Sequence, residues 1–262
     1  MCGSFRNRGT SIERSRVLTE RRWKISRRIG KLRWDRRFIS LLILAAVALA
    51  TWSWLRDNPG SNPWAPLDLR DEPGWATERK IRALRDDPAQ CRAVLERSEV
   101  AFTALPSAGE GPCRRQNPTR LQGYPLSPDT PPTSCAVAAA MEIWLEQGVQ
   151  PAAREIYGQG IARIEHLGAY SCRRLYGADT GPWSEHATAN AIDISAFVLE
   201  DGSRISLLGN WNDEDDDARF LRKARDAACE VFGTVLSPDY NAAHRDHFHF
   251  DQQARGFGGV CR

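Results

Sequence analysis

A run of 18 uncharged, mostly apolar residues near the N-terminus constrains this chain more than any other feature. It extends from Phe38 to Leu55 (FISLLILAAVALATWSWL). A helix of that length is just long enough to cross the hydrocarbon core of a bilayer. The run therefore predicts a transmembrane helix over residues 38–55, with Trp52 and Trp54 at the end where interfacial tryptophans belong.

The distribution of charge gives this helix a direction. Residues 1–37 carry 13 lysines and arginines but only three acids, a net charge of +10. Basic segments stay on the cytoplasmic side of a membrane. We therefore expect residues 1–37 to be a basic cytoplasmic tail, in a single-pass protein of the inner membrane whose C-terminal domain is periplasmic.

Two other interpretations of this N-terminal region stay open. A cleaved signal peptide is one, because small residues between Ala46 and Ala50 offer cleavage sites, although a basic region of 37 residues is long for a signal. Arg36-Arg37 is also a minimal match to a twin-arginine export signal. The basic tail could bind nucleic acid, but membrane orientation already explains its charge, so no nucleic-acid partner is expected.

The cysteines agree with export. One of the seven, Cys2, precedes the apolar run and six follow it. An even number in an exported domain predicts up to three disulfides, whose pairing the sequence leaves open. The alternative is that some are buried free thiols. The six are Cys91, Cys113, Cys135, Cys172, Cys229 and Cys261.

The remaining chain predicts a tether and one folded domain. Residues 56–75 are rich in Pro, Gly, Asn and Asp and predict the tether. Residues 76–262 mix helices and strands without a regular β-α-β rhythm, which is typical of an α+β fold. Periodicity and turn residues predict helices over 80–98, divided at Pro88, over 135–148, capped by Ser134 and stopped by Gly148, and over 218–232; they predict strands over 161–167, 191–199 and 247–251.

Four of the five histidines lie in two short stretches, SEHATANAID (residues 184–193) and HRDHFH (residues 244–249). Neutral imidazoles and carboxylates are the usual ligands of catalytic zinc, and three protein ligands leave a fourth position open for water. The two stretches therefore predict a zinc site. The alternative is a set of ordinary hydrogen-bonded histidines, which is how we interpret His166, outside both stretches.

A spacing of two places three polar side chains of the last strand on one face. His247, His249 and Asp251 would point toward a cleft, while Phe248 and Phe250 point into a core.

The other stretch places a carboxylate in an apolar strand. Asp193 lies between isoleucines, and an unpaired charge there would be very costly, so it needs a metal ion or an arginine as partner.

A hydrolytic zinc site also needs a base and a group that stabilises a developing oxyanion. His247 is the best candidate for the base, because it shares a strand face with His249, and His244 could assist it. Arg173 or Arg174 could stabilise the oxyanion. The alternative for each arginine is an ordinary surface charge.

Residues 74–262 resemble the bacterial extensin-like C-terminal domain family. The segments that carry the resemblance are Cys91-Arg92-Ala93, Tyr170–Arg173, Ser184–Asp193, Phe232–Leu236 and Tyr240–Asp251. More distantly, Ser-x-His-x6-Asp followed by His-x-His is similar to zinc peptidases grouped with D-Ala-D-Ala metallopeptidases, lysostaphin-type enzymes and hedgehog domains. The spacing His-x2-His-x-His looks like that of penicillin-insensitive murein endopeptidases.

The distant resemblance implies a site and a substrate. The ligands of Zn²⁺ would be His186, Asp193 and His249, with His247 as the catalytic histidine and His244 as an accessory one. It also implies an α+β fold with a small central antiparallel sheet and flanking helices. The substrate would be peptidoglycan stem or cross-link peptides, cleaved by a murein endopeptidase or DD-carboxypeptidase.

The peptidases usually carry a glycine after the histidine of the first motif, whereas this loop reads ATANA (residues 187–191); the difference bears on loop shape and substrate more than on metal binding. The alternative function is a non-catalytic zinc-containing domain that binds cell wall or a partner protein, since kinship of fold does not establish activity.

Overall fold

The computed structural model describes residues 33–253 and 259–262. Contacts between residues divide the chain into two units, Met1–Thr51 and Trp52–Arg262, which are described separately. Most of the predicted basic tail, residues 1–32, and with it Cys2, lies outside the described residues.

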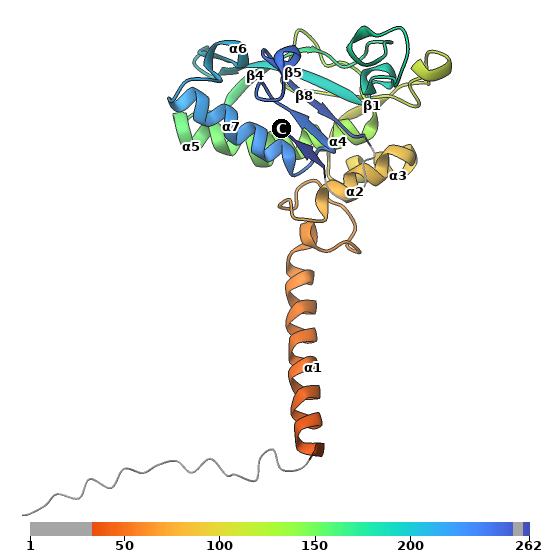
Figure 1. The fold of residues 1–262 in the computed structure, drawn as a ribbon, viewed down its shortest axis with the longest axis vertical. Helices are drawn as coiled ribbons and strands as arrows, with labels where there is room; N and C mark the ends of the chain where they lie inside the picture. The colour runs from red at the N-terminus through yellow and green to blue at the C-terminus, as the bar shows by residue number, and fades with distance from the viewer. Residues whose placement is uncertain (1–32, 254–258) are drawn as a thin grey trace, which may run out of the picture. The chain divides into compact units, whose positions relative to one another are not determined.

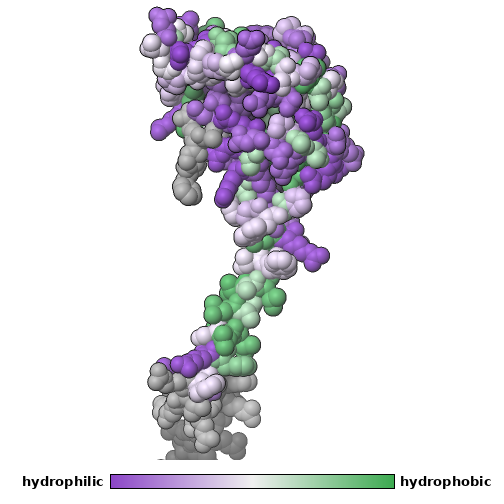
Figure 2. Space-filling model, turned by 90° about the vertical axis from the view of Figure 1, so that its right-hand side faces the viewer, coloured by the Kyte–Doolittle hydropathy of each residue, from purple (hydrophilic) through white to green (hydrophobic). Residues whose placement is uncertain are grey.

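One long helix contains the apolar run. Helix α1 extends from Arg33 to Asp57, and its stretch Trp34–Asp57 is long and apolar enough to cross a membrane, with none of its most apolar part buried inside the protein. Figure 2 shows the hydrophobic side chains along this helix. In water this surface would be unfavourable, which supports the prediction that a membrane surrounds it.

The second unit is built around one sheet. In the described residues seven strands form it in the order β3-β4-β5-β8-β7-β9, with β6 also paired to β5. The pairs in its centre are antiparallel, and β3–β4 and β7–β9 are parallel. The strands are β3 (Leu126–Ser127), β4 (Ile161–Gly168), β5 (Ala191–Leu199), β6 (Arg204–Ser206), β7 (Thr234–Leu236), β8 (Phe248–Asp251) and β9 (Val260–Cys261). A separate hairpin pairs β1 (Phe102–Ala104) with β2 (Thr119–Leu121).

Helices cover one face of this sheet, which confirms the predicted α+β class (Figure 1). Their positions agree with several local signals: the hydroxyl of Ser134 accepts a hydrogen bond from the amide of Val137, and the predicted first helix divides at Pro88. The α-helices of the second unit are α2 (Thr77–Ala83), α3 (Pro88–Arg97), α4 (Cys135–Ile143), α5 (Gln150–Tyr157), α6 (Leu207–Asn210) and α7 (Asp216–Cys229), of which α4, α5 and α7 lie along that face.

The prediction that Gly148 ends a helix was wrong. After α4 the chain continues through a π-helical turn, Trp144–Val149, into α5. Gly148 is needed for packing, because a Cβ there would lie 2.5 Å from the Cβ of Ala227 on α7. The wider turn precedes Pro151, which has no amide hydrogen to donate. The helix ends instead at Gly158, with a φ of 70°.

The core lies between the helices and the sheet and holds large aromatic side chains. Phe248 and Phe250, both on β8, are fully buried there, as their alternation predicted. The ring of Trp144 packs edge-on against Phe250 with centroids 5.2 Å apart, and its indole nitrogen donates to the carbonyl of Ala224. This contact anchors β8 to the helical layer, so the opposite side of β8 is presented on the open face of the sheet.

The predicted tether is in part a component of the folded unit. Leu67 and Leu69 are buried in the core, and the side-chain amide of Gln147 donates to the carbonyls of Leu69 and Asp71. The composition of residues 56–75 predicted a tether, and two leucines of this segment belong to the hydrophobic core.

Three disulfides connect the six cysteines of the described domain, as predicted in number. Cys91–Cys135 joins α3 to α4, Cys113–Cys172 joins the irregular segment after β1 to the loop after β4, and Cys229–Cys261 joins the end of α7 to β9. The paired cysteines are separated by 44, 59 and 32 positions in the sequence, respectively. Loops of this size correspond to roughly 3–4 kcal/mol of stabilisation each by restriction of the unfolded chain.

We expect alkylation of the native protein under denaturing conditions without reductant to modify Cys2 alone. Reduction should then expose six further thiols, each adding one alkyl group to the intact mass. Peptide mapping without reductant should recover the three pairs named above. Six reactive thiols before reduction, or a different pairing, would contradict this arrangement.

Gly148→Ala should lower the free energy of unfolding by about 1–3 kcal/mol, because the added methyl overpacks the contact with Ala227. Ala227→Gly in the same chain should restore part of the loss, which a double-mutant cycle in urea would measure. Additive effects of the two substitutions would show that this contact is not the reason for the glycine.

Candidate metal centre

Two neighbouring strands bring the predicted ligands together. Asp193 on β5 and His249 on β8 are directly opposite each other in the antiparallel pair. On β5, Ile192 and Ile194 are fully buried, so the side chain of Asp193 points to the other face of the sheet. The register of this pair therefore places a carboxylate and an imidazole side by side.

The third predicted ligand comes from a short 3-10 helix, Glu185–Thr188, just before β5. The hydroxyl of Ser184 accepts a hydrogen bond from the amide of His186 and caps this turn. The chain then reverses at Ala189, whose φ is 57°. That is the left-handed conformation, which favours glycine and costs another residue about 1–2 kcal/mol. The loop therefore adopts a glycine-type turn although it contains no glycine.

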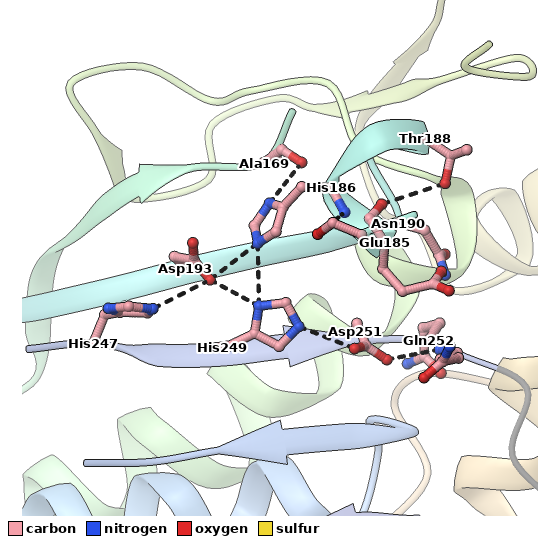
Figure 3. Close-up of polar contacts among 12 residues, drawn as sticks. Ala169, Glu185, His186, Thr188, Asn190, Asp193, His247, His249, Asp251 and Gln252 are labelled. Atoms are coloured by element: carbon pink, nitrogen blue, oxygen red, sulfur yellow. Dashed lines mark hydrogen bonds and ion pairs between the residues drawn. The ribbon is translucent and has the colours of Figure 1, made fainter. Parts of the chain in front are cut away.

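The three donor atoms converge on one point (Figure 3). His186 Nε2 lies 3.2 Å from Asp193 Oδ1 and 3.1 Å from His249 Nδ1, and these last two atoms are 3.0 Å apart. Ligands at about 2.0–2.1 Å from a tetrahedral zinc ion are separated by about 3.3–3.4 Å. The observed triangle is close to that size, so a small cation fits it with only a slight expansion.

The outer nitrogens of both rings determine where their hydrogens lie. His186 Nδ1 is 3.1 Å from the carbonyl oxygen of Ala169, and His249 Nε2 is 3.0 Å from a carboxylate oxygen of Asp251. Both oxygens only accept, so in the neutral rings these outer nitrogens carry the hydrogen. The inner nitrogens then present lone pairs toward the carboxylate of Asp193, an arrangement that requires a cation or a proton between them.

The electrostatics of the site favour positive charge at this point. Burial would raise the pKa of Asp193, but hydrogen bonds from His186 and His249 hold it well below its usual value. Burial lowers the pKa of His249, but its bonds to Asp193 and Asp251 outweigh this and raise it to about 9. Zinc binding would replace that proton by a divalent charge.

All six predicted site residues line one cavity of about 550 Å³: Arg173, His186, Asp193, His244, His247 and His249. The sequence left Arg173 and Arg174 as alternatives. Arg174 instead stacks over the ring of Trp183, 4.5 Å from its centroid. His166 is not part of this cavity and hydrogen-bonds to the carbonyl of Asp129.

The other two histidines lie beside the three donors. His247 Nε2 is 3.8 Å from Asp193 Oδ1, and its Nδ1 is 2.9 Å from Asp246. The ring of His244 is 5.2 Å from that of His247. Burial and the neighbouring His247 and His249 lower the pKa of His244 to about 4, so its ring is neutral at neutral pH.

The sequence did not predict a role in this site for Asp251 or for the residues that support the loop before β5. Asp251 shares a strand face with His249, and that spacing could have indicated its contact with the ring. A hydrogen-bond chain from Ser134 through Asn190 to Glu185 also holds the loop between the ligands. It joins residues distant in sequence, so no local pattern reveals it.

Residues 89–262 match the family model described as extensin-like protein C-terminus. The chain belongs to this family. The match includes every residue of the candidate centre and confirms the resemblance noted from the sequence. A search of curated proteins and a search of solved structures each found no match.

In this extensin-like domain, His249→Ala and His186→Ala should each abolish stoichiometric zinc binding. Each substitution removes one of three protein ligands, and a catalytic zinc site needs all three. His166→Ala, a histidine outside the cavity, is the matched control and should leave binding unchanged. Metal content after dialysis and isothermal titration would measure this. Equal zinc affinity in His249→Ala and the native protein would rule out the assigned centre.

Asp251→Asn should weaken zinc affinity by about 10–100-fold, because the amide no longer accepts the His249 hydrogen as a carboxylate does. Asp246→Asn removes a carboxylate that contacts His247 and should leave affinity unchanged. Competition with a chromophoric chelator would compare the two variants. Similar losses in both would indicate a general effect of charge.

Proposed function

We propose that this extensin-like domain is a zinc-dependent hydrolase of amide bonds in peptidoglycan stem or cross-link peptides. The observation that carries the proposal is the triangle of lone-pair donors, His186, Asp193 and His249, in an open cavity that also contains His244 and His247. Two imidazoles and one carboxylate are a common donor set of hydrolytic zinc sites.

A zinc ion held by these ligands would supply Lewis-acid polarisation of a carbonyl and activation of water. His247 would accept and return the proton, because its Nε2 lies next to the donor triangle and its Nδ1 is held by Asp246. Arg173, on the cavity wall, would stabilise negative charge on the carbonyl oxygen. His244 stays neutral and adds no charge to the cluster.

Location supports this class of substrate. The apolar helix α1 and the three disulfides fit an anchored domain in an oxidising compartment. We propose that α1 spans the inner membrane with the basic tail in the cytoplasm, so that the domain faces the cell wall in the periplasm. The distant resemblance to murein endopeptidases is the reason for proposing peptidoglycan peptides as the substrate.

A second function is favoured by the mouth of the cavity. Tyr176, Trp183 and Tyr240 line it and are exposed, and exposed aromatic side chains are common in binding surfaces. The domain would then be a non-catalytic zinc-containing module that binds cell wall or a partner protein. The position of His247 beside Asp193 favours the enzyme.

The zinc-loaded protein should release new peptide products from purified sacculi and cross-linked muropeptides, detected by liquid chromatography and mass spectrometry. His249→Ala should release none. His247→Ala should retain zinc and lose activity by about 10²–10⁴-fold, as expected for loss of a proton-transfer group.

The controls separate the two functions. Products that are absent with both histidine variants establish the hydrolase and identify the bond. Retention of sacculi by zinc-loaded protein without any product would instead support the binding module.

A further inference from the structure

Two tryptophans outside the cavity are unusually exposed. The side chains of Trp64 and Trp75 are 83% and 66% exposed, respectively. Both lie in the segment between α1 and α2, which the proposed catalytic site does not use (Figure 1). Large aromatic side chains in water are unfavourable, so an exposed pair calls for a surface that covers it.

Hydrogen bonds hold Trp64 close to the end of α1. The side-chain amides of Asn58 and Asn62 donate to the carbonyls of Trp54 and Leu55, in the last turns of the helix, at 2.7 and 3.3 Å. The amide of Trp64 in turn donates to Asn62. Two residues span at most about 7 Å between Cα atoms. Trp64 is therefore within a short distance of the helix end.

Trp75 is brought to the same place by close contact between two glycines. A Cβ on Gly74 would lie 2.4 Å from the hydroxyl oxygen of Ser61 and 2.6 Å from the carbonyl carbon of Gly60, so only glycine permits this approach. The amide of Ala76 donates to the carbonyl of Gly60 at 3.1 Å.

Lys80 adds a third connection, because its ammonium donates to the carbonyl of Pro59. We call residues 58–64 and 74–80 together the collar.

The collar has the chemistry of a membrane-interface contact. Tryptophan is enriched at the level of the lipid headgroups, where its ring is apolar and its N–H stays hydrated. Arg56 and Arg79, both exposed, precede and follow the two tryptophans in the sequence, and their charge suits anionic headgroups. Trp52 and Trp54, in the last turns of α1 just before the collar, are also exposed.

We propose that Trp64 and Trp75 insert into the bilayer interface and seat the domain on the membrane. The proposal rests on retention of α1 as a membrane anchor, and it is independent of the hydrolase activity. It replaces the predicted tether by a docked domain, because the collar includes the start of α2 and is hydrogen-bonded to the end of α1.

The test uses the full-length protein in vesicles of phosphatidylcholine and phosphatidylglycerol, with and without acyl-chain bromination. Brominated lipid should quench part of the tryptophan fluorescence, and aqueous iodide should fail to quench that part. The variant Trp64→Phe/Trp75→Phe should lose a clear share of the lipid-quenchable signal. Trp183→Phe, which removes an exposed tryptophan at the cavity, is the matched control and should keep it.

The opposite result is equally clear. If the fluorescence lost in Trp64→Phe/Trp75→Phe is quenched by iodide and not by brominated lipid, or by neither, the collar does not contact the bilayer and the proposal fails. Carbonate extraction of the same vesicles tests the anchor separately, since loss of the protein from the membrane shows that α1 does not span it. Zinc-dependent cleavage is not measured, so failure of the proposed function leaves this test intact.

Discussion

The carboxylate of Asp193 is the constraint on which the rest of the candidate centre depends. It lies within a strand whose neighbouring residues, Ile192 and Ile194, are fully buried. A shift of one residue in the pairing of β5 would turn the carboxylate into the core and the isoleucines toward the cavity. An unpaired charge in that position would be very costly. The register is therefore tied to the imidazole of His249, which lies opposite the carboxylate, and to that of His186 beside it.

The surrounding fold fixes those imidazoles through contacts with their outer nitrogens. The carbonyl of Ala169 and the carboxylate of Asp251 each bind the outer nitrogen of one ring, so the inner nitrogens face Asp193. The disulfide Cys113–Cys172 fixes the loop that supplies both that carbonyl and Arg173. On the other side of the sheet, Trp144 packs against β8 and keeps His249 on the open face. Each contact restricts a rotation or a shift that would separate the donors.

Local patterns predicted much of the fold because their causes are local. The strand over residues 191–199 and the face of the HxH strand follow from the alternation of side chains, and the start of α4 follows from its serine cap. Gly148 was interpreted wrongly for the opposite reason, and the composition of residues 56–75 did not predict that two of its leucines are buried. Gly148 meets Ala227, far along the chain, and Leu67 and Leu69 belong to a core formed mostly by residues distant in sequence. The composition of a short segment does not predict contacts with residues far away in the sequence.

The sequence alone determined which side chains could bind a metal, the period of two that puts His247 and His249 on one face, and the even number of cysteines after the apolar run. Only the tertiary structure decided that His186 meets Asp193 and His249, that Arg173 rather than Arg174 lines the cavity, and which cysteines pair. The physical reason is that strand register, loop reversal at Ala189 and the packing of the helical layer bring together atoms that no spacing along the chain relates. The tautomers of the two rings are likewise set by hydrogen-bond partners from other parts of the fold.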